Sequence, residues 1–209
     1  MASTDKKNRS NRRWLDEHFN DPYVQLAQQK GYRSRASFKL LEIHEKDHLI
    51  RQGMTVLDLG AAPGGWSQIA SNLVGRHGRV IATDILEMAP LEGVEFIHGD
   101  FREQQIYDRI VAALPGGHAD LVISDMAPNI SGMGIVDQPR AMYLVELALD
   151  MARNVLGPEG AMLVKVFQGS GSEEFLKAMR ASFNKVVIRK PKASRPRSRE
   201  VYMLGRNIL

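Results

Sequence analysis

Short runs of apolar and β-branched residues recur along the middle of the chain, and stretches with helical spacing of apolar residues separate them. Runs of this length are typical of buried strands, whereas the longer stretches between them are typical of helices. The predicted strands span residues 54–59, 79–83, 94–98, 119–124 and 161–167. The predicted helices span residues 66–74, 103–113, 138–155 and 172–182. The alternation predicts an α/β fold with a mostly parallel sheet and helices on both faces.

The two ends of the chain depart from this alternation. Ahead of the first strand, helices are predicted at residues 12–19, at 22–30 and from just after Ser34 to about residue 45. Beyond the last helix, predicted strands at 185–190 and 200–204 are separated by a polar loop without room for a helix. Strands joined in this way predict an antiparallel hairpin at the C-terminal edge of the sheet.

Length and composition favour one domain. The chain has 209 residues, 44% of them hydrophobic and none of them cysteine, which excludes disulfides and thiolate metal sites. No apolar run approaches the ~20 residues needed to cross a bilayer. We predict a disordered basic tail at residues 1–10 and a single domain at residues 11–209. The first residues lack the apolar core of a secretory signal, so a cytoplasmic location is predicted, with a short transit peptide as the alternative.

Charge is distributed unevenly along the chain. Residues 1–40 hold nine Lys and Arg against four acids (+5), and residues 41–184 hold eleven against nineteen (−8). Residues 185–209 hold eight against one (+7). Basic ends around an acidic middle favour a polyanionic partner held by the two ends. On charge alone, the alternative is that the basic ends only keep the protein soluble.

The first predicted strand continues into a loop of small residues, DLGAAPGGW at positions 58–66. Small residues let the backbone turn sharply and approach a ligand, but the loop has neither the dinucleotide-binding nor the phosphate-binding glycine pattern. Asp84 ends the second strand and could accept hydrogen bonds from ribose hydroxyls, and Asp100, after the third strand, could accept one from an adenine amino group. Because ligands bind at the carboxyl ends of parallel strands, these acids predict a nucleoside cofactor without phosphate.

Candidate catalytic groups follow the later strands. Lys165 lies inside the apolar fifth strand, where a lysine is costly to bury unless it is paired. The alternative, a lysine that snorkels from an edge strand, fits poorly because this strand should be central. Asp125 ends the fourth strand, in SDMAPN. Lys39, on the third helix, and Glu200, the one acid after position 184, would each pass for ordinary surface residues alone.

Together, Lys39, Asp125, Lys165 and Glu200 occur in the order and contexts of the K-D-K-E tetrad of FtsJ/RrmJ-type RNA 2′-O-methyltransferases. The chain resembles that family from about Trp14 to Leu204, including DLGAAPGGW, SDMAPN, VKVFQG and SRPRSREVY. The resemblance implies a seven-stranded methyltransferase sheet, S-adenosylmethionine as cofactor and Lys165 as proton acceptor. It also implies cofactor contacts at Gly64, Trp66, Asp84, Asp100 and Asp125.

Chemistry permits a lysine base without deciding for it. Methyl transfer from a sulfonium requires alignment of donor and nucleophile and needs no metal, and removal of the hydroxyl proton assists the attack. Burial and the nearby cation of Lys39 favour a neutral Lys165, whereas the carboxylates of Asp125 and Glu200 favour its charged form. Lys165 could instead orient the hydroxyl and stabilise developing negative charge.

RNA is the implied partner. Within the family, the chain is most similar to bacterial enzymes that methylate a uridine ribose in the A-loop of 23S rRNA, so rRNA within the large subunit is the expected substrate, in ribosome maturation. Helices within residues 11–46 and the C-terminal loop are expected to bind RNA, with phosphate contacts predicted for Arg12, Arg13, Arg33, Arg35, Arg195, Arg197 and Arg199. We expect a monomer.

Two alternatives stay open. The same chemistry could act on tRNA or an mRNA cap, because the tetrad is shared, or the chain could be a non-catalytic ribosome-assembly factor that keeps the fold. A base N-methyltransferase fits less well, because Ala127-Pro128-Asn129 stands where such enzymes tend to place a Pro-Pro-aromatic element.

Overall fold

The computed structural model describes residues 21–128 and 131–209. The predicted tail 1–10 and helix 12–19, with Arg12 and Arg13, lie outside these residues. The helices are α2 (Pro22–Gln29), α3 (Ser37–Asp47), α4 (Gly65–Val74), α5 (Gln104–Ala113), α6 (Gly134–Val155) and α7 (Ser172–Ser182), with 3-10 turns η1 (Gly75–His77) and η2 (Pro115–Gly117). The strands are β1 (Thr55–Leu59), β2 (Arg79–Asp84), β3 (Val94–His98), β4 (Ala119–Ser124), β5 (Leu156–Phe167), β6 (Phe183–Arg189) and β7 (Glu200–Ile208).

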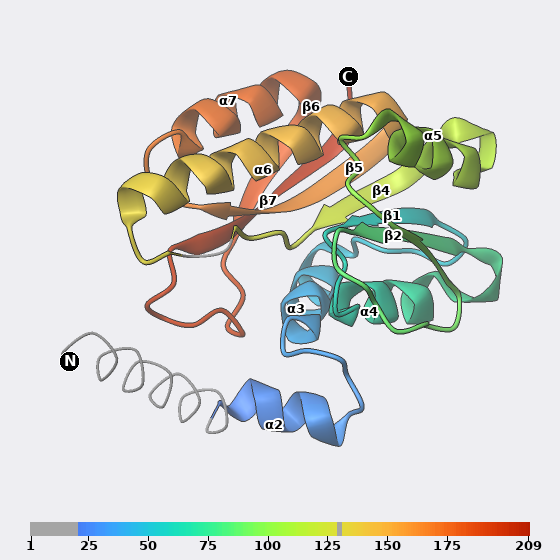
Figure 1. The fold of residues 1–209 in the computed structure, drawn as a ribbon, viewed down its shortest axis with the longest axis horizontal. Helices are drawn as coiled ribbons and strands as arrows, with labels where there is room; N and C mark the ends of the chain where they lie inside the picture. The colour runs from blue at the N-terminus through green and yellow to red at the C-terminus, as the bar shows by residue number, and fades with distance from the viewer. Residues whose placement is uncertain (1–20, 129–130) are drawn as a thin grey trace.

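One sheet of seven strands runs through the molecule in the order β3-β2-β1-β4-β5-β7-β6 (Figure 1). The first five of these strands are parallel, and β7 is antiparallel to both β5 and β6. The predicted mostly parallel sheet and the antiparallel pairing of the last two strands are therefore confirmed. The later of those two strands, β7, lies inside the sheet, and β6 forms its outer edge.

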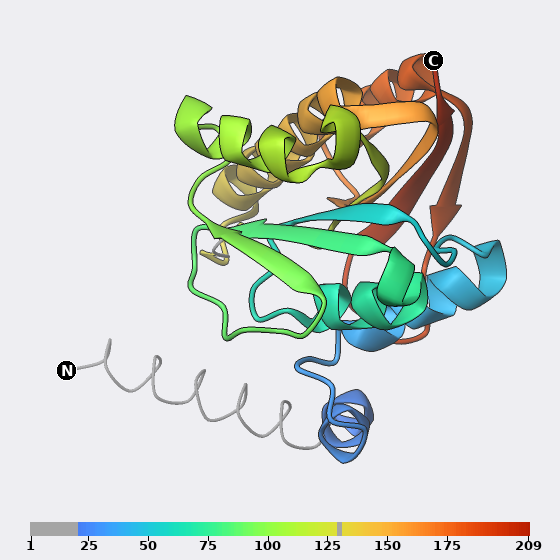
Figure 2. The ribbon, with the colours of Figure 1, turned by 90° about the vertical axis from the view of Figure 1, so that its right-hand side faces the viewer.

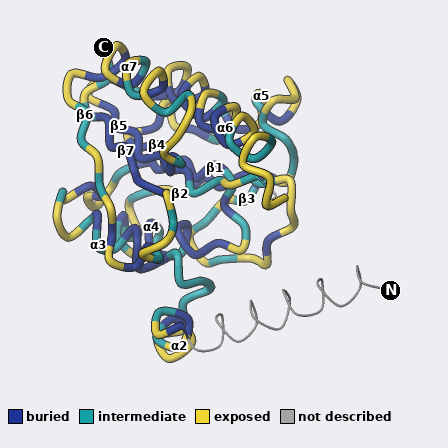
Figure 3. Tube along the Cα trace, turned by 90° about the vertical axis from the view of Figure 1, so that its left-hand side faces the viewer, coloured by how far each residue is buried: buried dark blue, intermediate teal, exposed yellow. Residues whose placement is uncertain are grey.

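Helices cover both faces of the sheet, with α5, α6 and α7 on one face and α3 and α4 on the other (Figures 1 and 2). Alternate residues of each strand feed two separate cores: Leu57 and Val122 pack under α6, whereas Val56 and Leu121 face α3 and α4. Burial on both faces explains the near-continuous apolar strands, and the sheet is buried throughout its centre (Figure 3). The short α2 lies apart from the sheet and packs through Ala27.

Three predicted boundaries are wrong by several residues: the starts of α6 and β5, and the end of β7, which lies at Ile208 rather than 204. α6 begins at Gly134 rather than 138, so Pro139 lies in its second turn. The carboxylate of Asp137 accepts hydrogen bonds from the backbone N–H groups of Ser131 and Gly132, which stabilises this early start. β5 begins at Leu156 rather than 161, because Leu156 already pairs with Ala119 of β4; regular pairing resumes at Ala161, and residues 157–160 between them form the register shift.

The topology brings the carboxyl ends of β1, β2, β4 and β5 to one edge of the sheet, where the loops predicted to bind a cofactor emerge. The third helix, α3, covers the α4 side near that edge (Figure 2). Across the described ranges 21–128 and 131–209, none of the helices has the length and apolar character needed to cross a membrane.

Candidate active site

The four predicted catalytic side chains converge beyond the carboxyl end of β4, against β5 and β7. In the antiparallel β5–β7 pair, Lys165 stands opposite Tyr202 and Phe167 stands opposite Glu200. Side chains two residues apart on a strand share a face, so Lys165, Tyr202 and Glu200 all project toward α3. Asp125 follows directly after β4, which neighbours β5, and Lys39 reaches this face from α3.

The tetrad is arranged as two ion pairs, in which Lys39, Lys165 and Glu200 are buried and Asp125 is partly buried. Lys165 Nζ lies 3.0 Å from Asp125 Oδ1 and also donates to the Asp125 carbonyl oxygen. Lys39 Nζ lies 2.7 Å from Glu200 Oε1. Lys39, Lys165 and Glu200 are each at most 8% exposed. Removal of one partner would leave a buried charge uncompensated, which is strongly destabilising.

Tyr202, which the sequence reasoning missed, joins the two pairs. Its hydroxyl donates to Asp125 Oδ1 at 2.8 Å, and Lys39 Nζ lies 5.6 Å from the centre of its ring. The ring also packs against Trp66, with centroids 5.6 Å apart. Because Tyr202 stands two residues after Glu200 in a strand, the period of two was the signal that could have placed it on the same face.

Burial and charge set the ionisation of this cluster. Burial alone would raise the pKa of Glu200, but Lys39, Ser194 and Lys165 together hold that pKa below its ordinary value of 4.5. Burial, and then the carboxylates of Asp125 and Glu200, raise the pKa of Tyr202 well above 10.0. Glu200 is therefore an anion and Tyr202 a neutral hydrogen-bond donor at neutral pH.

The loop after β1 is held close to its neighbours by two glycines with positive φ, Gly60 (74°) and Gly64 (100°). A Cβ on Gly60 would lie 2.1 Å from Met126 Cγ, and one on Gly64 would lie 2.8 Å from Met88 Sδ. Both backbone conformation and space therefore require glycine here. The loop packs against the segments that follow β2 and β4.

The acids predicted to hold a cofactor already have protein partners. Asp84 accepts hydrogen bonds from the backbone N–H groups of Ala62 (2.9 Å) and Leu86 (2.8 Å). Asp100 is paired with Arg102, whose Nε lies 2.9 Å from each carboxylate oxygen, and this partner lowers the pKa of Asp100. A carboxylate has about four acceptor positions, so both acids keep capacity for a ligand.

Behind this loop, Asp58 is a buried acid within β1. It is 1% exposed, and its carboxylate accepts a hydrogen bond of 2.6 Å from the hydroxyl of Ser67 on α4. Burial raises the pKa of Asp58 to about 7; the Ser67 hydrogen bond opposes this rise, and the charges of Asp125 and Asp84 add to it. A carboxylate that titrates near neutral pH thus lies near the end of β1, just before the loop predicted to bind the cofactor.

Trp66 and Arg33 connect the loop to the N-terminal segment. The indole of Trp66 is buried and donates to the Ala36 carbonyl at 2.8 Å, so any contact of Trp66 with a cofactor falls to its backbone. The Arg33 guanidinium donates to the carbonyl oxygens of Pro63 (3.2 Å), Ala89 (2.6 Å) and Pro90 (2.6 Å). Arg33, predicted to bind RNA, thus connects the loop after β1, which is predicted to bind the cofactor, to the loop after β2.

The remaining predicted arginines gather around the loop between β6 and β7. Arg35 pairs with Asp21 at 2.5 Å, and Arg195 lies 3.5 Å from the same acid. Arg197 and Arg199 are exposed on the loop. Within the described residues, no group of three or more His, Asp or Glu side chains is arranged to hold a metal ion.

Comparison with known proteins gives a consistent result. Residues 32–208 match the family described as FtsJ-like methyltransferase. The chain is similar to the ribosomal RNA large subunit methyltransferase E of Stutzerimonas stutzeri, with 61% identity over 201 residues, covering 96% of this chain and 98% of that protein. The protein of the same name from Alcanivorax borkumensis is 64% identical over 199 residues, covering 95% and 96%.

A solved structure is also similar. A Plasmodium falciparum chain, described as a ribosomal RNA methyltransferase, superposes with a TM-score of 0.71 at 26% identity, covering 85% of this chain and 99% of that one. The family match spans most of the described fold and includes Lys39, Asp125, Lys165 and Glu200. The chain therefore belongs to the FtsJ-like methyltransferase family.

Proposed function

We propose that the protein transfers a methyl group from S-adenosylmethionine to the ribose 2′-hydroxyl of a uridine in the A-loop of 23S rRNA, acting in the cytoplasm during maturation of the large ribosomal subunit. The observation that carries this proposal is the convergence of Lys39, Asp125, Lys165 and Glu200 into two ion pairs beside the cofactor loop. The names of the similar bacterial proteins support the large-subunit rRNA as substrate.

The residues at the edge of the sheet fit a nucleoside cofactor. Asp84 ends β2, whereas Asp100 and Asp125 come after β3 and β4. Along the sheet the order is therefore Asp100, Asp84 and Asp125, with the loop after β1 between the last two. Acids suit hydroxyl and amino groups, and the glycines at 60 and 64 leave room for a close approach. S-Adenosylmethionine would supply the electrophilic methyl group there.

Lys165 is proposed to accept the proton of the ribose hydroxyl as its oxygen is methylated. Asp125 fixes the position of Lys165 Nζ through both its carboxylate and its carbonyl oxygen. Lys39 would place a second cation near the reacting oxygen. Its ion pair with Glu200 carries no net charge. The other role, in which Lys165 orients the hydroxyl as an ammonium group, differs in its pH dependence, because only a base must lose its proton first.

The proposal is tested with labelled S-adenosylmethionine and large ribosomal subunits from cells that lack this methylation. We expect label in the 23S rRNA, on the 2′-oxygen of one uridine in the A-loop, and none with Lys165→Ala. Label in tRNA or capped mRNA instead would support the first alternative. A folded protein that binds subunits and transfers no methyl group would support a non-catalytic assembly factor.

A further inference from the structure

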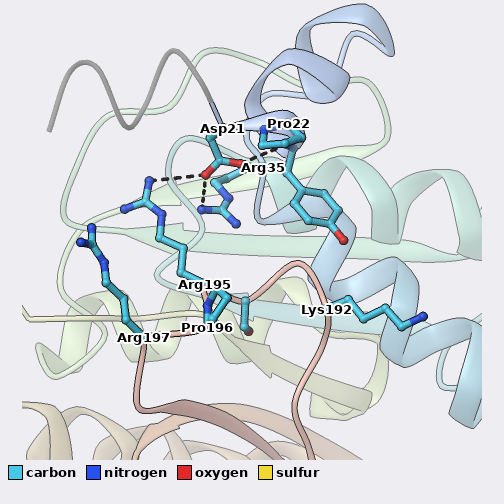
Figure 4. Close-up of a pocket in the computed structure, with 9 residues that line it drawn as sticks. Asp21, Pro22, Arg35, Lys192, Arg195, Pro196 and Arg197 are labelled. Carbon is cyan, nitrogen blue, oxygen red and sulfur yellow. Dashed lines mark hydrogen bonds and ion pairs between the residues drawn. The ribbon is translucent and has the colours of Figure 1, made fainter. Parts of the chain in front are cut away.

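A cavity of about 610 Å³ lies between the start of α2 and the loop that joins β6 to β7 (Figure 4). Among the described residues that line it, four are cations, Arg35, Lys192, Arg195 and Arg197, and one is an acid, Asp21, so these residues carry a net charge of +3 (4 − 1). A concave surface with this charge attracts anions. The carboxylate of Asp21, which pairs with two of these arginines, indicates how such an anion would be bound.

Asp21 draws the arginines together. Its Oδ2 lies 2.5 Å from Arg35 Nη1 and 3.5 Å from Arg195 Nη2, and its side chain is 9% exposed (Figure 4). Its Oδ1 accepts a hydrogen bond from the backbone N–H of Tyr23 at 3.0 Å, so Asp21 also caps α2. One carboxylate therefore does two tasks that need different chemistry: capping needs an oxygen acceptor, and pairing needs a negative charge.

The two arginines are held differently. Arg35 is fixed on three sides, by Asp21, by the Ala193 carbonyl at 2.5 Å and by the Tyr23 ring, 5.8 Å from its guanidinium. Arg195 is farther from the acid and more exposed, at 32% against 18% for Arg35. Arg195 and Arg197 lie side by side and extend toward α2 (Figure 4). The weakly held Arg195 is thus the group that a stronger anion could take over.

The cavity adjoins the tetrad. Arg35 lies in the turn directly before α3, and its carbonyl oxygen accepts a hydrogen bond from the backbone N–H of Phe38, the neighbour of Lys39. Ser194 lines the cavity and also lowers the pKa of Glu200. The charge of Arg35 also acts on Tyr202. A strand of RNA whose ribose lay at Lys165 would therefore bring a neighbouring phosphate to this surface.

We propose that this cavity binds a backbone phosphate of the RNA substrate beside the methylated nucleotide, and that Asp21 takes the place of that phosphate on Arg195 while RNA is absent. The inference rests on the proposed function, because it takes RNA as the substrate. A phosphodiester offers two charged oxygens that match the planar guanidinium fork. Asp21 keeps the arginines in position and competes with the phosphate for Arg195.

Two substitutions test the proposal in opposite directions. Asp21→Asn keeps a capping oxygen for α2, since Asn and Asp cap about equally well, but removes the competing charge. Arg195→Gln removes the phosphate donor. Arg180→Gln, an exposed arginine on α7, is the matched control. Binding of a labelled short single-stranded RNA is measured by fluorescence anisotropy over a range of salt, and methylation of large subunits is measured with the same proteins.

We expect Arg195→Gln to weaken RNA binding by about three- to tenfold and to reduce the slope of log K against log salt by about 0.7. Asp21→Asn should tighten RNA binding by about two- to fivefold, and Arg180→Gln should change neither quantity. Thermal melting checks that each variant is folded. A purely structural role for Asp21 would instead give weaker RNA binding in the Asn variant.

Unchanged RNA affinity and salt slope with Arg195→Gln would overturn the phosphate site. If RNA binding were unchanged while the KM for subunits rose, the cavity would bind a ribosomal protein, and the inference would be wrong. Weaker binding by Asp21→Asn would overturn the competition by Asp21. A wild-type protein that methylates no RNA refutes the proposed function separately, because the anisotropy measurements do not depend on methyl transfer.

Discussion

The predicted cofactor half of the site, at β1 and β2, and the tetrad half, at β5 and β7, are held together by different interactions. In the predicted cofactor half, glycines and acids lie at or just after the ends of parallel strands, and backbone groups hold them, as in the two N–H groups bound to Asp84. In the tetrad half, side chains on paired strands fix one another through ion pairs. A substitution in the first half should therefore cause a partial loss of cofactor affinity. A substitution in the second half should cause a large loss of the methyl-transfer rate.

The largest effect is expected in the tetrad half, at Lys165. Lys165→Ala should lower the rate of methyl transfer by about 10²–10⁴-fold, roughly 3–5 kcal/mol of barrier, because the hydroxyl loses its proton acceptor. Lys165→Arg should recover little, since guanidinium stays protonated. Circular dichroism and thermal melting check that each variant is folded. Single-turnover kinetics then measure the rate, and calorimetry should show cofactor affinity within a few-fold of wild type. Lys177→Ala, an exposed lysine on α7, is the control.

The same kinetics decide what Lys165 does. As a base, it should give a single-turnover rate that rises with pH until the ammonium is largely deprotonated. A flat profile with an active arginine variant would leave an orienting role, and a fully active alanine variant would refute the tetrad itself.

The next effect concerns the stability of the cofactor half. Because the pKa of Asp58 is about 7 in the folded protein against 3.8 ordinarily, the folded state keeps a proton that the unfolded state releases between those values. The free energy of unfolding should therefore fall as pH rises from 3.8 to about 7 and then level off. The difference of about three pKa units sets an upper limit of about 4 kcal/mol.

Asp58→Asn should remove this loss, so the variant gains stability relative to wild type as pH rises through the window. Urea unfolding at a series of pH values measures the difference. Parallel stability curves for the two proteins would show that Asp58 titrates normally.

A smaller loss is expected at Asp84. Asp84→Ala should weaken S-adenosylmethionine binding by about one to two orders of magnitude, roughly 1.5–3 kcal/mol for lost charge-assisted hydrogen bonds. Part of the loss would come from the loop, because Ala62 and Leu86 lose their acceptor. Calorimetry with Glu174→Ala, an exposed acid on α7, as the control measures it. Unchanged affinity in a folded variant would remove Asp84 from the cofactor site.

The smallest effect is expected at Tyr202, where the two halves meet. Tyr202→Phe keeps the ring against Trp66 and removes the hydrogen bond to Asp125. Loss of one such bond is worth about 1 kcal/mol, so methyl transfer should slow by roughly fivefold with cofactor affinity retained. An equal loss in cofactor affinity would mean that Tyr202 acts through Trp66 and the loop.

The strands were predictable because their signals are local, whereas Lys39 and Glu200 were grouped with Asp125 and Lys165 only by the family resemblance. Lys165 and Glu200 each interrupt a pattern, one an apolar run and the other a basic tail, and antiparallel pairing of the two strands brings them to one face. The start of β5 was not predictable, because the glycines and proline at 157–160 disfavour a strand, and the pairing of Leu156 with β4 arises only in the folded sheet.

Contacts between segments that are distant in the sequence could not be predicted from the sequence alone. Arg33 reads as one more basic residue, yet it donates to carbonyl oxygens more than 25 positions away. The pairing of Asp21 with Arg195 joins segments that only the folded chain brings together. Charge counts predict how many cations a region holds, and tertiary structure decides which of them are already paired.

The position of β7 has a consequence for synthesis of the protein. The ribosome makes β7 after the other six strands, but in the sheet β7 separates β5 from β6 and contributes Glu200 and Tyr202. A nascent chain that already contains Lys39, Asp125 and Lys165 therefore has no acid for Lys39 and no hydroxyl for Asp125. The set of two ion pairs and the Tyr202 hydrogen bond is complete only when β7 has inserted between β5 and β6, so we expect a growing chain to stay inactive until then.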